Sequence, residues 1–231
     1  MKYLLPLILL CLISCGHKKT DLERRAEEVR KEKADKQKRI ENNKQRHKTD
    51  SLAAIAWGDA IFSMTKDETL KTKAFCGGDV YDNIIEMNYE RLFAFREAFD
   101  LPLLYSIKAY FVKGQLENIF IDSRKVGARD FTKLERECII LKNQFYRIYG
   151  QPKSTNDVSF SGFNSDGNQH VASFSVEGRL FKDITIELQK DEYDYSYHIS
   201  ISGRTTRELL EEWILKSQDD KNPDDVVIYS F

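Results

Sequence analysis

Ten consecutive residues, 193–202, alternate strictly between large apolar or aromatic side chains and polar ones. The first set is Tyr193, Tyr195, Tyr197, Ile199 and Ile201, and the second is Asp194, Ser196, His198, Ser200 and Ser202. Successive side chains of a strand point to opposite faces of a sheet. The pattern therefore predicts a strand of an antiparallel sheet with one buried face and one face in water.

The same alternation recurs in four other segments, at 103–112, 116–121, 170–176 and 180–188. Short polar or glycine-containing sequences separate them: Lys113-Gly114, Glu177-Gly178 and Asp191-Glu192. Such spacing favours hairpins of neighbouring antiparallel strands. The stripe of the fourth segment contains a lysine, Lys182, among apolar residues.

Three segments have helical signals. Phe131 to Tyr149 carries an apolar stripe and ends at Gly150, with Pro152 just beyond. Thr65 to Glu68 fits a capping box, which predicts a helix from Thr65 to Phe75. Residues 205–216 favour a closing helix, 217–231 an acidic tail, and 81–100 are compatible with either strand or helix.

Two hairpins resemble each other at an offset of 64 residues. Val112 to Leu116 matches Val176 to Leu180, and an Ile-x-Ile follows each. We expect two tandem units, 57–125 and 126–203, each a helix followed by antiparallel strands, packed as one α+β domain over 51–216. The alternative is chance similarity of two glycine hairpins.

A charged segment precedes this domain. Residues 17–50 hold thirteen Lys and Arg against eight Asp and Glu, whereas 51–231 hold 22 against 29. Pairs such as Glu27 with Lys31 predict a solvated helix within a stalk over 15–50. Some apolar residues fit a heptad, but the pattern is too weak to establish a coiled coil. The stalk is a spacer or, alternatively, a basic helix lying on anionic lipid.

The first residues carry an export signal. Lys2 supplies a positive charge, and Tyr3 to Ile13 is an apolar run broken only by Pro6. This run fits a signal peptide and is shorter than the roughly 20 apolar residues of a transmembrane helix.

Leu12-Ile13-Ser14-Cys15 resembles the lipobox of bacterial lipoproteins. The resemblance implies removal of residues 1–14 and attachment of diacylglycerol and an acyl chain such as palmitate to Cys15. The alternative is an ordinary secretory signal in which Cys15 is incidental. Gly16 followed by basic residues implies, by the same resemblance, an outer-membrane protein facing the periplasm.

Cys76 and Cys138 are the remaining cysteines of the exported domain. An even pair in an oxidising compartment is a disulfide candidate, and two separate buried thiols are the alternative. The cysteine and histidine spacings do not suggest zinc.

Two short motifs resemble the BamE-like (SmpA/OmlA) family of small outer-membrane lipoproteins. Ile61 to Glu68 is similar to the "Gly-Met-Thr/Ser-Lys-x-(Glu/Gln)-Val" opening of that family, with Ser63 in place of the glycine. Tyr149 to Pro152 is similar to its "Leu-Gly-x-Pro" helix end. The resemblance implies two helices on a three-stranded antiparallel sheet, as in the β-lactamase-inhibitor-protein-like group.

The sequence contains no established catalytic motif, and we expect no enzyme activity, metal or cofactor. His170 falls on an apolar stripe, which favours a core histidine; His198 lies on the wet face, where a Ser–His–Asp site is a remote alternative. Tyr193, Tyr195 and Tyr197 are core or a binding face. The acidic domain argues against nucleic acid.

We expect a non-catalytic lipoprotein of the cell envelope that binds the bilayer through its anchor and another envelope protein through its domain. A periplasmic ligand-binding or enzyme-inhibitor module is the alternative, and an envelope hydrolase is a remote one.

Overall fold

The computed structural model describes residues 21–177 and 180–204. The chain divides into two units, Met1–Arg46 and His47–Phe231. Helix α2 (Asp21–Ala54) provides the described part of the first unit and continues into the second. Its side chains from 24 to 46 are exposed, as expected for a helix that is polar on all sides. The predicted long charged helix is thus confirmed.

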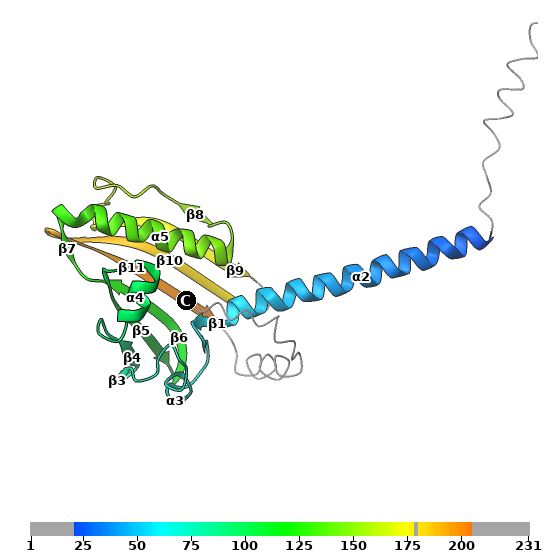
Figure 1. Ribbon diagram of the computed structural model, residues 1–231, viewed down its shortest axis with the longest axis horizontal. Coiled ribbons are helices and arrows are strands. Elements are labelled where there is room, and N and C mark those ends of the chain that lie inside the picture. Colours follow the sequence, from blue (N-terminus) through cyan, green and yellow to red (C-terminus); the bar gives the residue numbers. More distant parts are fainter. Residues whose placement is uncertain (1–20, 178–179, 205–231) are drawn as a thin grey trace, which may run out of the picture. The chain divides into compact units, whose positions relative to one another are not determined.

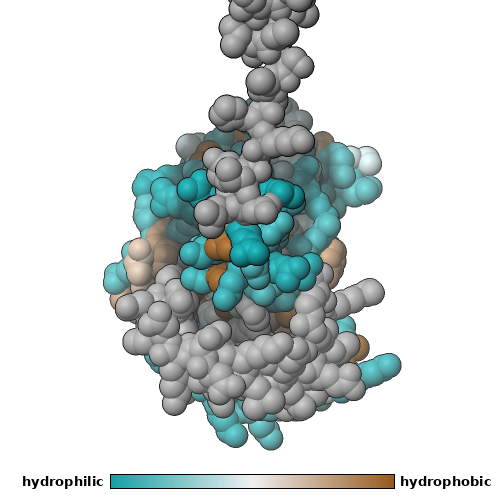
Figure 2. Space-filling view, turned by 90° about the vertical axis from the view of Figure 1, so that its right-hand side faces the viewer, coloured by the Kyte–Doolittle hydropathy of each residue, from teal (hydrophilic) through white to brown (hydrophobic). Residues whose placement is uncertain are grey.

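None of the helices in the described ranges is long and apolar enough to span a membrane. On the side of the molecule in Figure 2, most of the described surface is hydrophilic and the apolar areas are small.

The second unit is an α+β domain, as predicted (Figure 1). Its helices are α3 (Lys66–Thr69), α4 (Phe93–Phe99), the 3₁₀ turn η1 (Ala128–Asp130) and α5 (Phe131–Tyr149). Its strands are β1 (Ile55–Trp57), β2 (Ala60–Ile61), β3 (Asp79–Tyr81), β4 (Ile84–Met87), β5 (Leu104–Val112), β6 (Gln115–Ser123), β7 (Val126–Gly127), β8 (Ser154–Thr155), β9 (Asn168–Glu177), β10 (Phe181–Asp191) and β11 (Asp194–Arg204).

The main sheet is antiparallel, in the order β3-β4-β5-β6-β11-β10-β9-β8, and β7 pairs with β11. Two meanders, β3 to β6 and β8 to β11, therefore meet where β6 pairs with β11. In this pairing Ile199 lies opposite Ile121, and Ile201 lies opposite Ile119. All four isoleucines are buried, so the junction between the meanders lies in the hydrophobic core.

Helices pack on one face of the sheet. The apolar stripe of α5, which includes Leu134, Cys138, Leu141 and Phe145, joins the same core cluster as the buried residues of β5, β6 and β9 to β11. α4 contributes Phe95 and Phe99 to that cluster, and α5 runs along the sheet in Figure 1. Side chains of the opposite parity remain half-exposed, and no helix in the described part of the chain packs on them.

Several predicted elements are confirmed. α5 has the predicted bounds, Phe131–Tyr149, and the strand segments correspond to β5, β6, β9, β10 and β11. Lys113 and Gly114 both have positive φ, 52° and 81°, which is the conformation of a tight hairpin turn. The ambiguous segment 81–100 contains β4 and α4.

The predicted helix from Thr65 to Phe75 is wrong beyond its first turn. The capping box exists: Thr65 caps α3, and the Glu68 side chain accepts from the Thr65 N–H. However, α3 ends at Thr69. The Asp59 carboxylate accepts hydrogen bonds from the backbone N–H groups of Lys73 and Ala74, at 2.8 and 3.0 Å. These N–H groups would otherwise bond within a continuing helix.

The two predicted tandem units differ in their helices, because the first has only the short α3 and α4 where the second has the 19-residue α5. Their matching hairpins are β5–β6 and β9–β10. The predicted signal peptide, Cys15, the closing helix 205–216 and the acidic tail lie outside the described residues.

Gly203 allows a close approach between β11 and the segment after β2. A Cβ at this position would lie 2.2 Å from a ring carbon of Phe62, which is fully buried. We expect Gly203→Ala to lower the free energy of unfolding by about 1–3 kcal/mol, because the ring has no free space to move into. Urea denaturation of the purified chain measures the effect.

Gly127→Ala is the matched control. Gly127 is also in a strand, and a Cβ there meets no atom within 4 Å. Equal stability of both variants would contradict the packing of Phe62 on Gly203.

Candidate functional site

The predicted tyrosine face is not a surface. Tyr195 and Tyr197 are only 4% and 1% exposed, and they belong to the core. Tyr193 is 83% exposed, but it lies in the turn between β10 and β11 and not in the strand. The ring of Tyr195 instead packs edge-on against Phe131, with centroids 5.2 Å apart. The binding-face interpretation is therefore wrong for Tyr195 and Tyr197, for which the core interpretation holds, whereas Tyr193 is exposed.

Cys76 and Cys138 do not form a disulfide. Both thiols are free: Cys76 is exposed, and Cys138 is buried on the apolar stripe of α5. Burial raises the pKa of the Cys138 thiol, so this residue behaves as a small core side chain.

The half-exposed side of the sheet carries a polar surface, which we call the polar face. Residues opposite each other on neighbouring strands share a face, and the strand register places the members of the polar face together. They include Glu86, Lys108, Tyr110, Phe120, Asp122, His170, Ser173, Thr185, Glu187, His198 and Ser200.

A chain of charged and polar side chains crosses the polar face from β4 to β11. His198 Nδ1 lies 2.6 Å from Asp122 Oδ1, and Lys108 Nζ lies 3.2 Å from Asp122 Oδ2. Lys108 Nζ also lies 3.7 Å from Glu86 Oε1. The four side chains are between 22% and 28% exposed. They are thus ordered by one another while remaining in reach of a partner.

The electrostatics of Asp122 reflect this chain. Partial burial works to raise its pKa, but the hydrogen bond from His198 and the charge of Lys108 outweigh burial and hold the pKa below its usual value. Burial likewise opposes the charge of Lys108, yet Asp122 and Glu86 raise its pKa. Asp122 is therefore ionised at neutral pH and fixes the orientation of the two basic side chains.

Aromatic rings pack beside the charged chain. Phe120 stacks on His198 with ring centroids 5.2 Å apart, and Tyr110 meets Phe120 edge-on at 4.8 Å. The polar face thus combines charges, hydroxyl groups and aromatic area in one surface, and of these the aromatic side chains are the type enriched at protein interfaces.

His170 also belongs to the polar face, contrary to its predicted place in the core. The pairing of β9 with β10 shifts register between Ile186 and Glu187. Val171 and Ala172 are consequently both buried, and His170 turns to the half-exposed side. Its Nε2 lies 2.7 Å from Ser154 Oγ, which lies 2.7 Å from Ser173 Oγ.

The elements of a catalytic triad are divided between the two histidines. His198 contacts a carboxylate, Asp122, whereas His170 contacts a hydroxyl, Ser154. A nucleophilic site needs both partners on one imidazole. No group of metal-ligating side chains occurs within the described ranges either. The two histidines of the polar face therefore have different partners, a carboxylate for His198 and a hydroxyl for His170.

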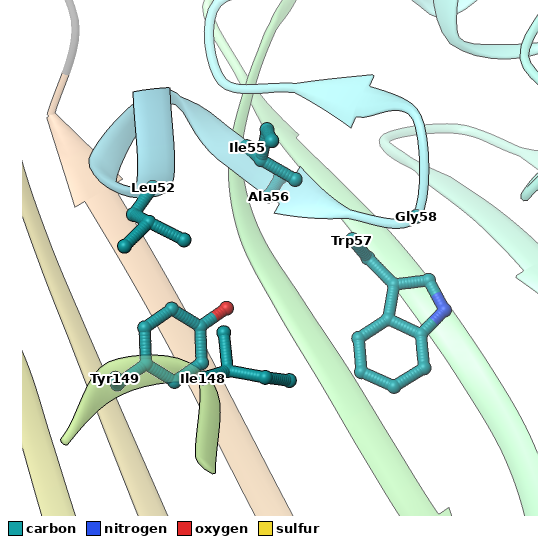
Figure 3. Close-up of a pocket in the computed structure, with 7 residues that line it drawn as sticks. All are labelled: Leu52, Ile55, Ala56, Trp57, Gly58, Ile148 and Tyr149. Carbon is teal, nitrogen blue, oxygen red and sulfur yellow. The ribbon is translucent and has the colours of Figure 1, made fainter. Parts of the chain in front are cut away.

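A second polar site is buried beside the cavity of Figure 3, whose lining residues belong to α2, β1, the turn after β1 and α5. The side chain of Lys182 on β10 is fully buried, and its Nζ lies 2.7 Å from the Ile55 carbonyl oxygen and 2.6 Å from the Tyr149 hydroxyl. Burial lowers the pKa of Lys182 to about 7 and raises that of Tyr149. The cavity beside Tyr149 has a volume of about 10 Å³ and is lined by residues such as Leu52, Trp57 and Ile148. Its volume is about that of one water molecule and is too small for an organic ligand.

Glu137 is the second buried titratable group. It lies on α5 and is 2% exposed. Its carboxyl accepts hydrogen bonds from the Leu103 N–H at 2.6 Å and from the Tyr197 hydroxyl at 3.2 Å. Burial raises its pKa to about 7, although these bonds oppose the change. The contact between Tyr197 and Glu137 was not predictable from the alternation pattern, which gives parity but no partners.

Comparisons with protein-family models, with curated proteins and with solved structures find no match for this chain.

Lys182 and Glu137 make the stability depend on pH in opposite directions. The pKa of Glu137 is raised from 4.5 to about 7 in the folded state, so stability falls as pH rises from about 4.5 to about 7. The pKa of Lys182 is lowered from 10.5 to about 7, so stability rises as pH rises from about 7 to about 10.5. Together they predict a minimum near pH 7, with slopes of at most about 1.4 kcal/mol per pH unit for each group.

Urea denaturation at a series of pH values measures these slopes. Glu137→Gln is expected to flatten the acidic limb alone, and Lys182→Met the basic limb alone. Variant and wild-type curves that stay parallel over the whole range would contradict the assignment.

Proposed function

We propose that this chain is a lipid-anchored protein of the bacterial cell envelope, at the outer membrane facing the periplasm, whose α+β domain binds another envelope protein through the polar face. The observation that carries the proposal is the one-sided covering of the sheet. In the described part of the chain the helices pack on one face. The other presents an ordered chain of charges beside aromatic rings.

A protein partner is favoured over a small ligand by shape. A pocket for an organic molecule has a volume of about 300–1,000 Å³, whereas the cavity beside Tyr149 is far smaller. A broad sheet face suits a macromolecular surface. An enzyme-inhibitor function would use the same face, and it predicts that the captured partner is an enzyme.

Photo-crosslinking tests the binding face. Ser200 lies between Phe120 and Thr185 at the centre of the polar face. We expect a photo-crosslinking amino acid at this position to capture one defined partner in intact cells. The same residue in place of Asn143, which is exposed on α5, is the control and is expected to capture none. Equal capture from both positions, or from neither, would contradict a role for the polar face.

Acylation tests the anchor independently. We expect Cys15→Ala to abolish incorporation of labelled palmitate and to release the protein from the membrane fraction, because stable anchoring requires the covalent acyl chains. Ser14→Ala, which keeps a small residue before Cys15, is the control and should remain acylated. A Cys15→Ala protein that still incorporates labelled palmitate would contradict the lipoprotein assignment.

A further inference from the structure

Two arginine side chains converge at the end of the sheet where β5 begins and β6 ends. Arg96 Nη2 donates to the Tyr89 hydroxyl at 2.7 Å and to the Pro102 carbonyl oxygen at 2.8 Å. Arg124 Nη2 donates to the same two oxygens, at 2.8 and 3.3 Å. Their guanidinium carbons lie 3.6 and 5.0 Å from the centroid of the Tyr89 ring. Two positive charges thus share one set of neutral acceptors.

Neither guanidinium has a carboxylate within ion-pair distance in the part of the chain that the structure describes. The acidic group that acts on Arg96 electrostatically is Glu137, but both of its oxygens are bonded to Leu103 and Tyr197. By contrast, Arg91 and Arg136 lie within ion-pair distance of Asp79 and Asp100. Within the described residues, Arg96 and Arg124 therefore converge without a carboxylate in direct contact with either guanidinium.

Arg96 is also short of hydrogen-bond acceptors. It is only 7% exposed, and its Nε and Nη1 are buried without a partner. Burying a charged donor without an acceptor is costly, so such groups are usually completed by a partner. Arg124 is exposed and shares both acceptors of the buried Arg96 guanidinium, so a ligand that binds Arg124 from the solvent lies next to Arg96.

Two tyrosine side chains, Tyr89 and Tyr105, lie beside the convergence of Arg96 and Arg124. Tyr105 is 51% exposed, and its ring centroid lies 6.4 Å from that of Tyr89. Tyrosine and arginine together are typical of the residues that dominate binding energy at interfaces.

We propose that Arg96 and Arg124, with Tyr89, form a binding site for an oxyanion of the carboxylate or phosphate class. Guanidinium groups match such anions with paired, charge-assisted hydrogen bonds. The anion would supply the acceptors that Arg96 lacks and neutralise the shared charge. This site differs from the charged chain of the polar face, and it stands whether or not the proposed partner exists.

Titration of the purified full chain with sodium acetate and with sodium phosphate, at ionic strength held constant with chloride, tests the proposal. The arginine Nε–H signals of the ¹⁵N-labelled protein report on the site by NMR. We expect a saturable shift of the Arg96 signal with at least one of the two anions. Saturation with acetate alone assigns the carboxylate class, and saturation with phosphate alone assigns the phosphate class.

Arg124→Gln is expected to raise the apparent Kd about tenfold, which corresponds to about 1.4 kcal/mol. Arg124→Lys, which keeps the charge but lacks the planar fork, should fall between it and the wild type. Arg147→Gln makes the same charge change at an exposed position in the last turn of α5. It should leave the Kd within about twofold of the wild-type value. A non-saturable shift, or one that Arg124→Gln leaves unchanged, would overturn the site.

Discussion

The pairing of β6 with β11 determines the architecture of the domain. It joins two four-stranded meanders into one sheet, and its register sets which side chains face the helices. A slip of one residue in an antiparallel pair exchanges the two faces. If β11 slipped by one residue against β6, Ile199 and Ile201 would turn to the side of Asp122, and His198 would turn to the covered side. The hydrophobic core and the polar face are therefore two consequences of one register.

The buried polar groups on the covered side have a shared structural role. Lys182 binds the Ile55 carbonyl in β1, Glu137 binds the N–H of Leu103 before β5, and Arg96 binds the Pro102 carbonyl. Each one makes a hydrogen bond to a backbone group in a short or connecting segment. A buried backbone group without such a bond would lower the stability of the fold. The charged forms of two of these groups, Lys182 and Glu137, are disfavoured by burial, and this explains why the stability of the domain is expected to respond to pH.

The sequence was most informative where one hydrophobic periodicity continued over many residues. The alternation at 193–202 and the stripe of Phe131–Tyr149 predicted β11 and α5, because many consecutive residues agree on one period. The predictions for the helix from Thr65 and for the position of His170 were wrong because of local contacts that the sequence pattern does not show. Asp59 ends α3 by binding N–H groups fourteen and fifteen residues away, and one register shift in β9 moves His170 from the core to the surface. The alternation in the sequence showed which side chains of each strand are polar. It could not show that His198 contacts Asp122, or that Arg96 and Arg124 share the Tyr89 and Pro102 oxygens, because these contacts depend on the tertiary structure.

The central claim is that the polar face is free in the isolated protein and occupied in the envelope. Thiol labelling tests it most directly, with Ser200→Cys in a Cys76→Ser background, since Cys76 is an exposed thiol and Cys138 is buried. We expect the cysteine at position 200 to react rapidly with a polar maleimide in the purified chain and to be protected in isolated envelopes. A cysteine that fails to react in the purified chain, or one that reacts equally fast in both preparations, would contradict the account.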